Sequence, residues 1–338
     1  MVKSLKSPCI VTFAILNKMI SKDLIEAREI LDANGVIGLP TETVYGLAGN
    51  IFSEMALRNI FEIKKRPFYN PLIVHLKNKE QLGLVAKEIP QKALMLAEEF
   101  WPGPLTLVLK KKNCVSNLVS AGKDTVAVRI PNHPMALELL AMLDYPLAAP
   151  SANPFQCISP TSAKHVEDYF GEIVPLVLDG GNCKRGLEST IVGFDNDNVI
   201  LYRLGALSIE SIESVVGEIV VLNENNKSPD APGMLSKHYS PRKRLILTSN
   251  MTETINENLD KQIGVLSLDS QFESNTILHS EVLSKDGNLV TAASKLYEAL
   301  HRLDMASIDL IIAERMPDVG IGRTMNDRLV RAANNERD

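Results

Sequence analysis

The chain alternates short apolar segments with amphipathic segments over its first 222 residues. Apolar residues recur every three to four positions in six segments, which predicts helices at 22–33, 54–63, 91–100, 134–143, 162–169 and 209–216. Short runs rich in Val, Ile and Leu predict strands at 36–39, 72–76, 105–109, 125–130, 147–150, 176–178, 190–194 and 199–203. Ser21 and Ser162 stand before two of the helices as start signals. Strands that alternate with helices indicate an α/β layer fold.

This pattern breaks between residues 223 and 241. The segment is rich in Asn, Ser, Pro and Gly and ends in His238-Tyr239-Ser240-Pro241, which is typical of a linker. Beyond it, strands at 244–247, 263–268 and 308–313 alternate with helices at 289–303 and 323–333. We therefore expect a first domain at 1–222 with its core at about 20–210, a linker at 223–241, and a second α/β domain at 242–338.

The composition is that of a globular protein with a polarised charge. The chain has 338 residues, of which 45% are hydrophobic and 23% charged, so it can bury a sizeable core. Its net charge is −5, yet residues 1–130 carry 18 Lys and Arg against 12 Asp and Glu, whereas residues 131–338 carry 18 against 29. The basic first part suits an anionic ligand such as a nucleotide, or RNA.

Cysteine use and hydropathy predict a cytoplasmic protein. The four cysteines are not spaced as a metal knuckle, a redox pair or a disulfide framework, so a reducing compartment is expected. The N-terminus lacks a signal-peptide core with a cleavage site, and no apolar run is long enough to span a bilayer. We therefore expect no membrane association.

A first candidate site lies in the string Lys-Lys-Arg-Pro-Phe-Tyr-Asn-Pro-Leu-Ile-Val-His. Lys64 and Arg66 stand at the end of a predicted helix, where cations also serve to complement the helix dipole. Asn70 and a strand that ends in His75 follow at once. A lone His is often structural, but the end of a strand in an α/β sheet is where ligands bind. Together these residues indicate a site for an anionic small molecule.

Arg129 is a second candidate because it falls inside an otherwise apolar strand. A buried arginine is costly unless it is paired, so it is expected to meet a carboxylate. That carboxylate belongs either to a ligand, which a guanidinium grips in a bidentate manner, or to the protein itself. The segment alone leaves both possibilities open.

Two further segments place small and polar residues after strands. Residues 148–153 read Ala-Ala-Pro-Ser-Ala-Asn, which allows a ligand close to the backbone but also suits an ordinary turn. Residues 179–192 contain Asp-Gly-Gly and then Glu-Ser-Thr-Ile-Val, and Arg203 ends the next strand. The sequence has no P-loop, no Rossmann glycine motif, no nucleophile elbow and no HExxH. Phosphoryl chemistry here would therefore depend on electrostatics and positioning.

The order of these motifs resembles the threonylcarbamoyl-AMP synthase family in its two-domain form. The resemblance rests on PTETVYGL at 40–47, KKRPFYNPLIVH at 64–75, WPGPLTLVL at 101–109, DTVAVRIP at 124–131, APSAN at 149–153, SPT at 159–161, ESTIV at 188–192 and APGMLSKHYSP at 231–241. It implies a twisted, mixed, open sheet with helices (YrdC-like), followed by a second, smaller Rossmann-like α/β domain.

The resemblance also implies an activity: L-threonine, bicarbonate and ATP give threonylcarbamoyl-AMP and pyrophosphate, for modification of tRNAs that read codons starting with A. Lys64 and Arg66 would be catalytic, with Mg²⁺ held mainly by the ATP phosphates. The linker would act as a lid. The implied ATP-binding residues are Lys64, Arg66, Asn70, Thr125, Ser151, Asn153, Ser159, Arg203 and Tyr239. The implied threonine-binding residues are Thr43, His75, Arg129, Ala149 and Ser189. The resemblance also implies transient contact with tRNA or with downstream threonylcarbamoyl-transfer proteins.

The chain departs from the family pattern in the loop Pro154–Ile158, where a Ser-Gly pair is usual, so this loop is expected to differ in shape. Two alternative functions remain. One is a double-stranded RNA or tRNA-binding module without catalysis, favoured by the basic first part but not by an aromatic content of only 5%. The other is carbamoyl transfer, although the zinc-finger cysteine pairs expected of such enzymes are missing.

Overall fold

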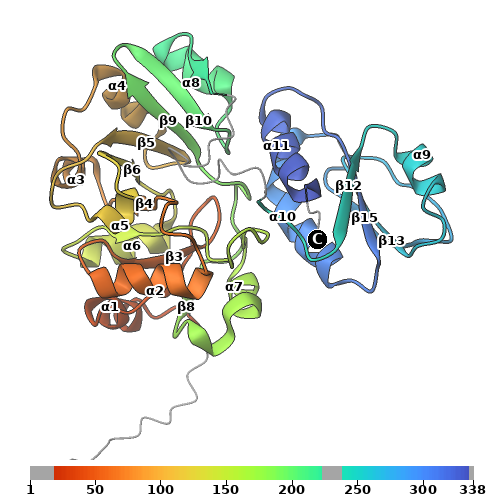
Figure 1. Cartoon of the computed structure of the whole chain (residues 1–338), viewed down its shortest axis with the longest axis horizontal. Helices are drawn as coiled ribbons and strands as arrows, with labels where there is room; N and C mark the ends of the chain where they lie inside the picture. Colours follow the sequence, from red (N-terminus) through yellow and green to blue (C-terminus); the bar gives the residue numbers. More distant parts are fainter. Residues whose placement is uncertain (1–18, 223–237, 335–338) are drawn as a thin grey trace, which may run out of the picture.

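The structure is a computed structural model that describes residues 19–222 and 238–334. It has two units, a larger one built on an eleven-stranded mixed sheet and a smaller one built on a four-stranded parallel sheet (Figure 1). This confirms the predicted fold class of a mixed open sheet with helices followed by a second α/β domain. The exact domain limits stay a prediction, since residues 223–237 lie outside the described residues.

The larger sheet has the strand order β1-β8-β2-β3-β7-β4-β6-β5-β9-β10-β11. It is mixed: β6 runs parallel to β4 and antiparallel to β5. All the predicted strands are present. The strands are β1 (Ile20–Ser21), β2 (Ile37–Leu39), β3 (Gly46–Asn50), β4 (Ile73–His75), β5 (Leu105–Lys110), β6 (Thr125–Arg129), β7 (Leu147–Ala148), β8 (Val177–Leu178), β9 (Thr190–Asp195), β10 (Asn198–Arg203) and β11 (Val220–Val221).

The helices of the larger unit also include every predicted one. They are α1 (Leu24–Asp32), α2 (Glu54–Lys64), α3 (Leu82–Val85), α4 (Gln91–Phe100), α5 (Asn117–Ser120), α6 (Pro134–Met142), α7 (Ala163–Phe170) and α8 (Ile209–Val216). Ser162 caps α7 as predicted, because its hydroxyl accepts a hydrogen bond from His165 N. The start signal at Ser21 was wrong: Ser21 ends β1, and the carboxylate of Asp23 caps α1 instead.

The strand β3, which lies between β2 and β7 in the sheet, was not predicted. Its sequence Gly-Leu-Ala-Gly-Asn has low strand propensity. Gly46 has a packing reason to be glycine, since a Cβ there would lie 3.0 Å from the Ala149 Cβ. The strand therefore forms because small residues allow its neighbours to approach closely, which a propensity scale does not register.

Hydrophobic side chains cover the two faces of the larger sheet unequally. On one face, helices α2, α4, α7 and α8 pack over most of the width of the sheet. On the other face, α1 and α6 pack only against the part formed by β2, β3, β7 and β8. The neighbouring part of that face, formed by β4, β5, β6 and β9, carries only a small cluster made of Ile73, Val108, Ala127 and Ile191. This uncovered part is where a ligand can reach the sheet.

The smaller unit has the strand order β12-β15-β13-β14, and all neighbouring strands are parallel. Its elements are β12 (Arg244–Thr248), α9 (Met251–Asn256), β13 (Ile263–Ser267), β14 (Ile277–Val282), α10 (Leu289–Met305), β15 (Leu310–Glu314) and α11 (Ile321–Ala333). Helices α10 and α11 lie between this sheet and the larger unit (Figure 1). Among the described residues, no helix is long and apolar enough to cross a membrane.

Candidate active site

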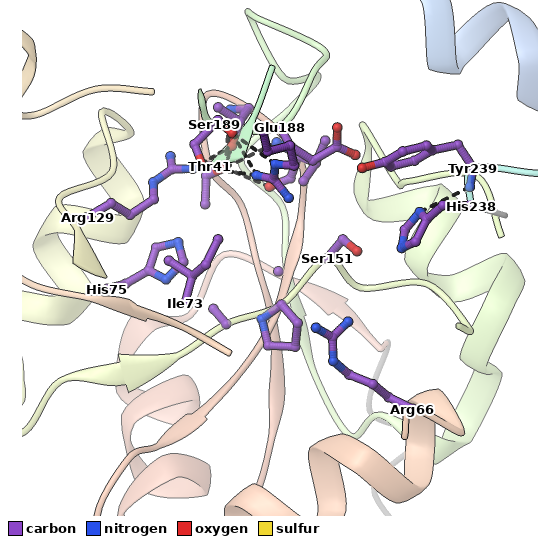
Figure 2. A pocket seen from close by; sticks show the side chains of 16 residues that line it. Thr41, Arg66, Ile73, His75, Arg129, Ser151, Glu188, Ser189, His238 and Tyr239 are labelled. Carbon is purple, nitrogen blue, oxygen red and sulfur yellow. Dashed lines mark hydrogen bonds between the residues drawn. The ribbon is translucent and has the colours of Figure 1, made fainter. Parts of the chain in front are cut away.

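A pocket lies on the uncovered part of the larger sheet, at the carboxyl ends of β4 and β6, and is partly open to solvent. Figure 2 shows Arg129 and His75 on one side of it and Arg66, His238 and Tyr239 on the other, with Ser151 between them. The pocket is lined by Thr41, Thr43, Val44, Gly46, Arg66, Ile73, His75, Arg129, Ala149, Pro150, Ser151, Glu188, Ser189, Arg203, His238 and Tyr239.

Arg129, the last residue of β6, is buried and does meet a carboxylate. Its Nη2 donates to both carboxylate oxygens of Glu42, at 2.8 and 2.9 Å, and its Nη1 donates to Thr43 Oγ1 at 3.0 Å. The protein therefore supplies the partner that the sequence left open. The buried Nε–H of Arg129 has no hydrogen-bond partner among the described residues. The guanidinium thus keeps donor capacity for a second anion in the pocket.

His75, the last residue of β4, lies beside Arg129 in the register of these parallel strands. Burial, and then the nearby charge of Arg129, lowers the pKa of His75 to about 3. The imidazole is therefore neutral near pH 7 and can accept a hydrogen bond at one nitrogen. A neutral ring beside a cation suits a ligand that carries both a carboxylate and a hydrogen-bond donor.

Hydroxyl groups complete this side of the pocket. Thr43 Oγ1 lies 2.8 Å from Thr41 Oγ1, and Ser189 Oγ lies 2.7 Å from Thr106 Oγ1. All the residues predicted to bind threonine line the pocket, which brings together Thr43, His75, Arg129, Ala149 and Ser189. Their roles stay predictions, but the geometry that those roles require is present.

The opposite side of the pocket is cationic and is organised around Arg66. Lys65 ends α2 in the left-handed conformation with φ of 52°, which turns the chain so that Arg66 leaves the helix. Arg66 Nη2 donates to Asn70 Oδ1 at 2.7 Å and to Pro71 O at 2.8 Å. Burial, and then the charge of Arg203, lowers the pKa of Arg66 to about 9, so it remains a cation at neutral pH.

Asn70 itself does not line the pocket, but it orients the arginine that does. Its buried Nδ2 finds no partner within the described part of the chain. Arg203, the last residue of β10, lines the pocket, and its Nη2 donates to Ser189 O at 2.7 Å. Arg66 and Arg203 thus place two positive charges on the pocket wall, as a polyanionic ligand requires.

Lys64, which was predicted to contact phosphate, lies just behind the pocket wall. Its ammonium is buried against the carbonyl oxygens of Ser151 and Asn153 and does not line the pocket. Burial, and then the charge of Arg66, lowers the pKa of Lys64. In this structure Lys64 fastens the loop after β7, so that Ser151 lines the pocket. Contact of Lys64 with phosphate stays a prediction.

Tyr239 lines the pocket with its hydroxyl buried and, among the described residues, without a partner. The loop that departs from the family pattern supports it: Cys157 pairs with Ser240 as a β-bridge, and Phe155 makes an edge contact with His238 at 6.1 Å between ring centroids. Asn153 holds the same loop by donating to the carbonyls of Pro154 and Cys157. The predicted lid falls mostly on residues 223–237, which lie outside the described residues.

Besides Lys64, Asn70 and Asn153, two more predicted nucleotide contacts, Ser159 and Thr125, are not brought to the pocket wall. Ser159 Oγ donates to Glu188 Oε1 at 2.6 Å, so its hydroxyl serves a pocket residue rather than the pocket itself. Thr125 begins β6 and Arg129 ends it, so the two residues lie roughly 13 Å apart along the strand. The two residues share a face of the sheet because their separation is even, so Thr125 lies farther along the same uncovered surface.

Sequence reasoning gave no role to three residues that line the pocket, Thr41, Glu188 and His238, or to Glu42, which pairs with Arg129 behind its wall. Thr41, Glu42 and Glu188 stood inside quoted motifs, and His238 stood in the linker. Glu42 could have been found from the requirement that a buried Arg129 meet a carboxylate, since an acidic residue in an otherwise uncharged turn is a natural partner. No sequence signal connects Glu188 to Tyr297 and Arg328, because these two partners belong to the smaller unit.

The sequence of this chain matches known protein families and proteins over most of its length. Residues 29–205 match the family described as "Telomere recombination", and residues 207–334 match "Threonylcarbamoyl-AMP synthase, C-terminal domain". A threonylcarbamoyl-AMP synthase of Pyrococcus abyssi is 39% identical over 313 residues, which covers 88% of this chain and 90% of that protein. The one of Bacillus subtilis is 39% identical over 319 residues, with coverage of 91% and 92%.

A solved structure is similar over the same extent. The crystal structure of P. abyssi Sua5 complexed with L-threonine superimposes with a TM-score of 0.86 at 36% identity, covering 92% of this chain and 94% of that chain. Sequence similarity therefore extends over both units, and the fold is shared throughout. This chain belongs to the threonylcarbamoyl-AMP synthase family.

Proposed function

We propose that this protein is a nucleotidyltransferase that makes L-threonylcarbamoyl-AMP from L-threonine, bicarbonate and ATP, with release of pyrophosphate. The product would supply the threonylcarbamoyl group for tRNAs that read codons starting with A. One observation carries the proposal: a single pocket has Arg129 and a neutral His75 on one side and Arg66 and Arg203 on the other (Figure 2). This arrangement suits an amino acid and a nucleotide held side by side.

Threonine would bind on the Arg129 side. Its carboxylate would take the donor capacity that Arg129 retains after pairing with Glu42, and the hydroxyls of Thr43 and Ser189 would serve its polar side chain. The neutral His75 would accept a hydrogen bond from the amine without adding positive charge beside it. A neutral, nucleophilic amine is what carbamate formation requires.

ATP would bind on the Arg66 side. Arg66 and Arg203 are both buried, and a buried cation acts on an anion more strongly than an exposed one. The Tyr239 hydroxyl has no protein partner in the described chain and is available to a nucleotide oxygen. Lys64 and Asn70 would contribute by holding the loop of Ser151 and the side chain of Arg66 in place.

The reaction joins two anions, so charge neutralisation is its main requirement. The threonine amine first takes up bicarbonate to form a carbamate, with loss of water. A carbamate oxygen then attacks the α-phosphorus of ATP, and the bond to the β-phosphate oxygen breaks as pyrophosphate leaves. Arg66 and Arg203 would stabilise the developing charge, and holding both substrates in one pocket would replace a costly encounter in solution.

Mg²⁺ would arrive with the nucleotide. The described residues contain no group of three or more His, Cys, Asp or Glu side chains placed to hold a metal ion. We propose that the ion is carried by the triphosphate as part of MgATP, where it would offset phosphate charge. The protein's own contribution is the pair of arginines and the shape of the pocket.

The burial of the cations separates this proposal from RNA binding. Arg66, Arg129 and Arg203 are 7%, 3% and 8% exposed, so a duplex backbone cannot reach them. Duplex RNA is recognised through surface contacts to its phosphates and sugars. Contact with tRNA or with downstream transfer proteins, and a cytoplasmic location, remain part of the proposal.

Pyrophosphate release tests the proposed function. The protein is incubated with MgATP, and release is measured with and without L-threonine and bicarbonate, using L-serine as the control amino acid. We expect release that requires both co-substrates and prefers threonine. Folded protein that releases no pyrophosphate in a threonine-dependent manner would count against the proposal.

A further inference from the structure

The smaller unit reaches the pocket through a buried ion pair. Arg328 of α11 is 0% exposed, and its Nε donates to Glu188 Oε2 at 2.9 Å. Glu188 precedes β9 in the larger unit and lines the pocket (Figure 2). The pair therefore joins a helix of the second unit to the wall of the site in the first.

Arg328 is committed to the protein on all three nitrogen atoms. Besides Nε, its Nη2 donates to Leu204 O at 2.6 Å and its Nη1 donates to Asp327. Its guanidinium carbon also lies 4.6 Å from the ring centroid of Tyr239, within the range of a cation–π contact. Since Arg328 does not line the pocket, any effect on a ligand must pass through Glu188, Tyr239 or the backbone beside Arg203.

Glu188 needs a positively charged partner because it places a carboxylate in a pocket that is proposed to bind anions. Its carboxylate accepts hydrogen bonds from Ser159 Oγ at 2.6 Å and from the Tyr297 hydroxyl, at 3.0 Å to each oxygen. Burial works to raise the pKa of Glu188, but the charges of Arg328 and Arg203 and the Ser159 hydrogen bond outweigh it and lower the pKa. Glu188 is thus an anion whose charge would repel a triphosphate if it were left unbalanced.

We propose that Arg328 of the second unit is a positioning residue for nucleotide binding: it balances the charge of Glu188 and fixes the ring of Tyr239 at the pocket wall. Tyr297 of α10 has a lesser share in the same task, since its ring stacks on Tyr239 at 5.8 Å and its hydroxyl meets Glu188. The inference rests on the proposed function. It gives the second unit a defined role, which is to complete the nucleotide side of the site.

The geometry also predicts which substrate is affected. Arg328 contacts Glu188, Tyr239 and the residue after Arg203, which belong to the cationic side. It has no contact with Arg129 or His75 among those found in the described chain. Loss of Arg328 should therefore weaken ATP binding while the KM for threonine stays near that of the parent.

The experiment compares Arg328→Met, Glu188→Gln, the double variant Glu188→Gln/Arg328→Met and Tyr297→Phe. KM for ATP and for threonine is measured from pyrophosphate release, and MgATP binding is measured separately by equilibrium titration, which needs no turnover. Removing one partner of a buried charge pair should raise the KM for ATP by about 30-fold or more in Arg328→Met. In the double variant, which also neutralises Glu188, the KM for ATP should be at least about tenfold lower than in Arg328→Met. Tyr297→Phe should raise the KM for ATP by less than Arg328→Met does.

Arg323→Met is the matched control, because Arg323 lies on the same helix and pairs with Glu210 of the larger unit at 2.6 Å, but near the surface. It should leave both KM values unchanged. Equal KM values for ATP in Arg328→Met and Arg323→Met would overturn the proposal, as would a double variant no better than Arg328→Met. If Arg328→Met does not fold, an unchanged KM for ATP in folded Tyr297→Phe overturns it. A parent protein that binds MgATP without threonine-dependent turnover would instead refute the proposed function.

Discussion

Replacing Arg129 by methionine separates two roles that the structure gives this residue. Arg129 neutralises Glu42, and the two side chains are 4% and 5% exposed. In Arg129→Met the Glu42 carboxylate keeps a hydrogen bond from Asn132 N at 3.0 Å but loses both bonds from the guanidinium. Breaking a buried ion pair in this way should lower the free energy of unfolding by about 3–5 kcal/mol.

The double variant Glu42→Gln/Arg129→Met removes the stranded charge. Its free energy of unfolding should recover to within about 1–2 kcal/mol of the parent, because the remaining cost is that of imperfect hydrogen bonding. Threonine use should not recover, since the proposed carboxylate anchor is gone in both variants. For both we expect kcat/KM for threonine to fall by about 30-fold or more.

Urea unfolding and the threonine dependence of pyrophosphate release measure the two effects. Arg58→Met is the matched control, because Arg58 forms an exposed pair with Glu54 one helical turn away and should change stability by no more than about 0.5 kcal/mol. Arg129→Met as stable as the parent would refute the argument from burial. A double variant that regains threonine-dependent activity would refute the anchoring role.

Three further predictions follow from single residues. The pKa of His75 is lowered to about 3 from its ordinary 6.5; between these values the unfolded state binds more protons, so stability should fall as pH falls from 6.5 toward 3. In acid unfolding, the free energy of unfolding of His75→Gln should depend less steeply on pH than that of the parent, and an equal dependence would contradict the argument from burial. Gly205→Ala places a Cβ 2.2 Å from Thr190 N, so thermal unfolding should show a loss of about 1–3 kcal/mol, and an unchanged midpoint would be inconsistent with this contact. Tyr239→Phe should raise the KM for ATP roughly tenfold with stability within about 1 kcal/mol of the parent, because its hydroxyl has no protein partner in the described chain; an unchanged KM would remove Tyr239 from the site.

Several parts of the fold were predictable because local pattern and final environment agree. The strand 125–129 is apolar with one arginine, and the structure buries it with a carboxylate against that arginine. Periodic helices such as 54–64 bury the face that their spacing indicated. Strand β3 escaped prediction because Gly46 serves close packing against Ala149, which lies about 100 positions away in the sequence.

In the site, too, some residues could be predicted from local sequence and others depend on distant parts of the chain. The side of the pocket that contains Arg129 and His75 follows from strand ends, which sequence reasoning can locate. Contacts of Lys64 and Ser159 with the nucleotide stay predictions, and no sequence signal indicated that Lys64 also lies against two carbonyls and Ser159 against Glu188. The contact between Glu188 and Arg328 joins residues 140 positions apart in separate units, and only the assembled fold reveals it.

The most direct test of the account is to identify the product. The protein is incubated with MgATP, L-threonine and ¹³C-labelled bicarbonate, and the nucleotides are resolved by mass spectrometry. The account predicts threonylcarbamoyl-AMP that carries one ¹³C atom, formed in step with pyrophosphate and absent when threonine is left out. Folded protein that yields no labelled adenylate under these conditions would contradict it.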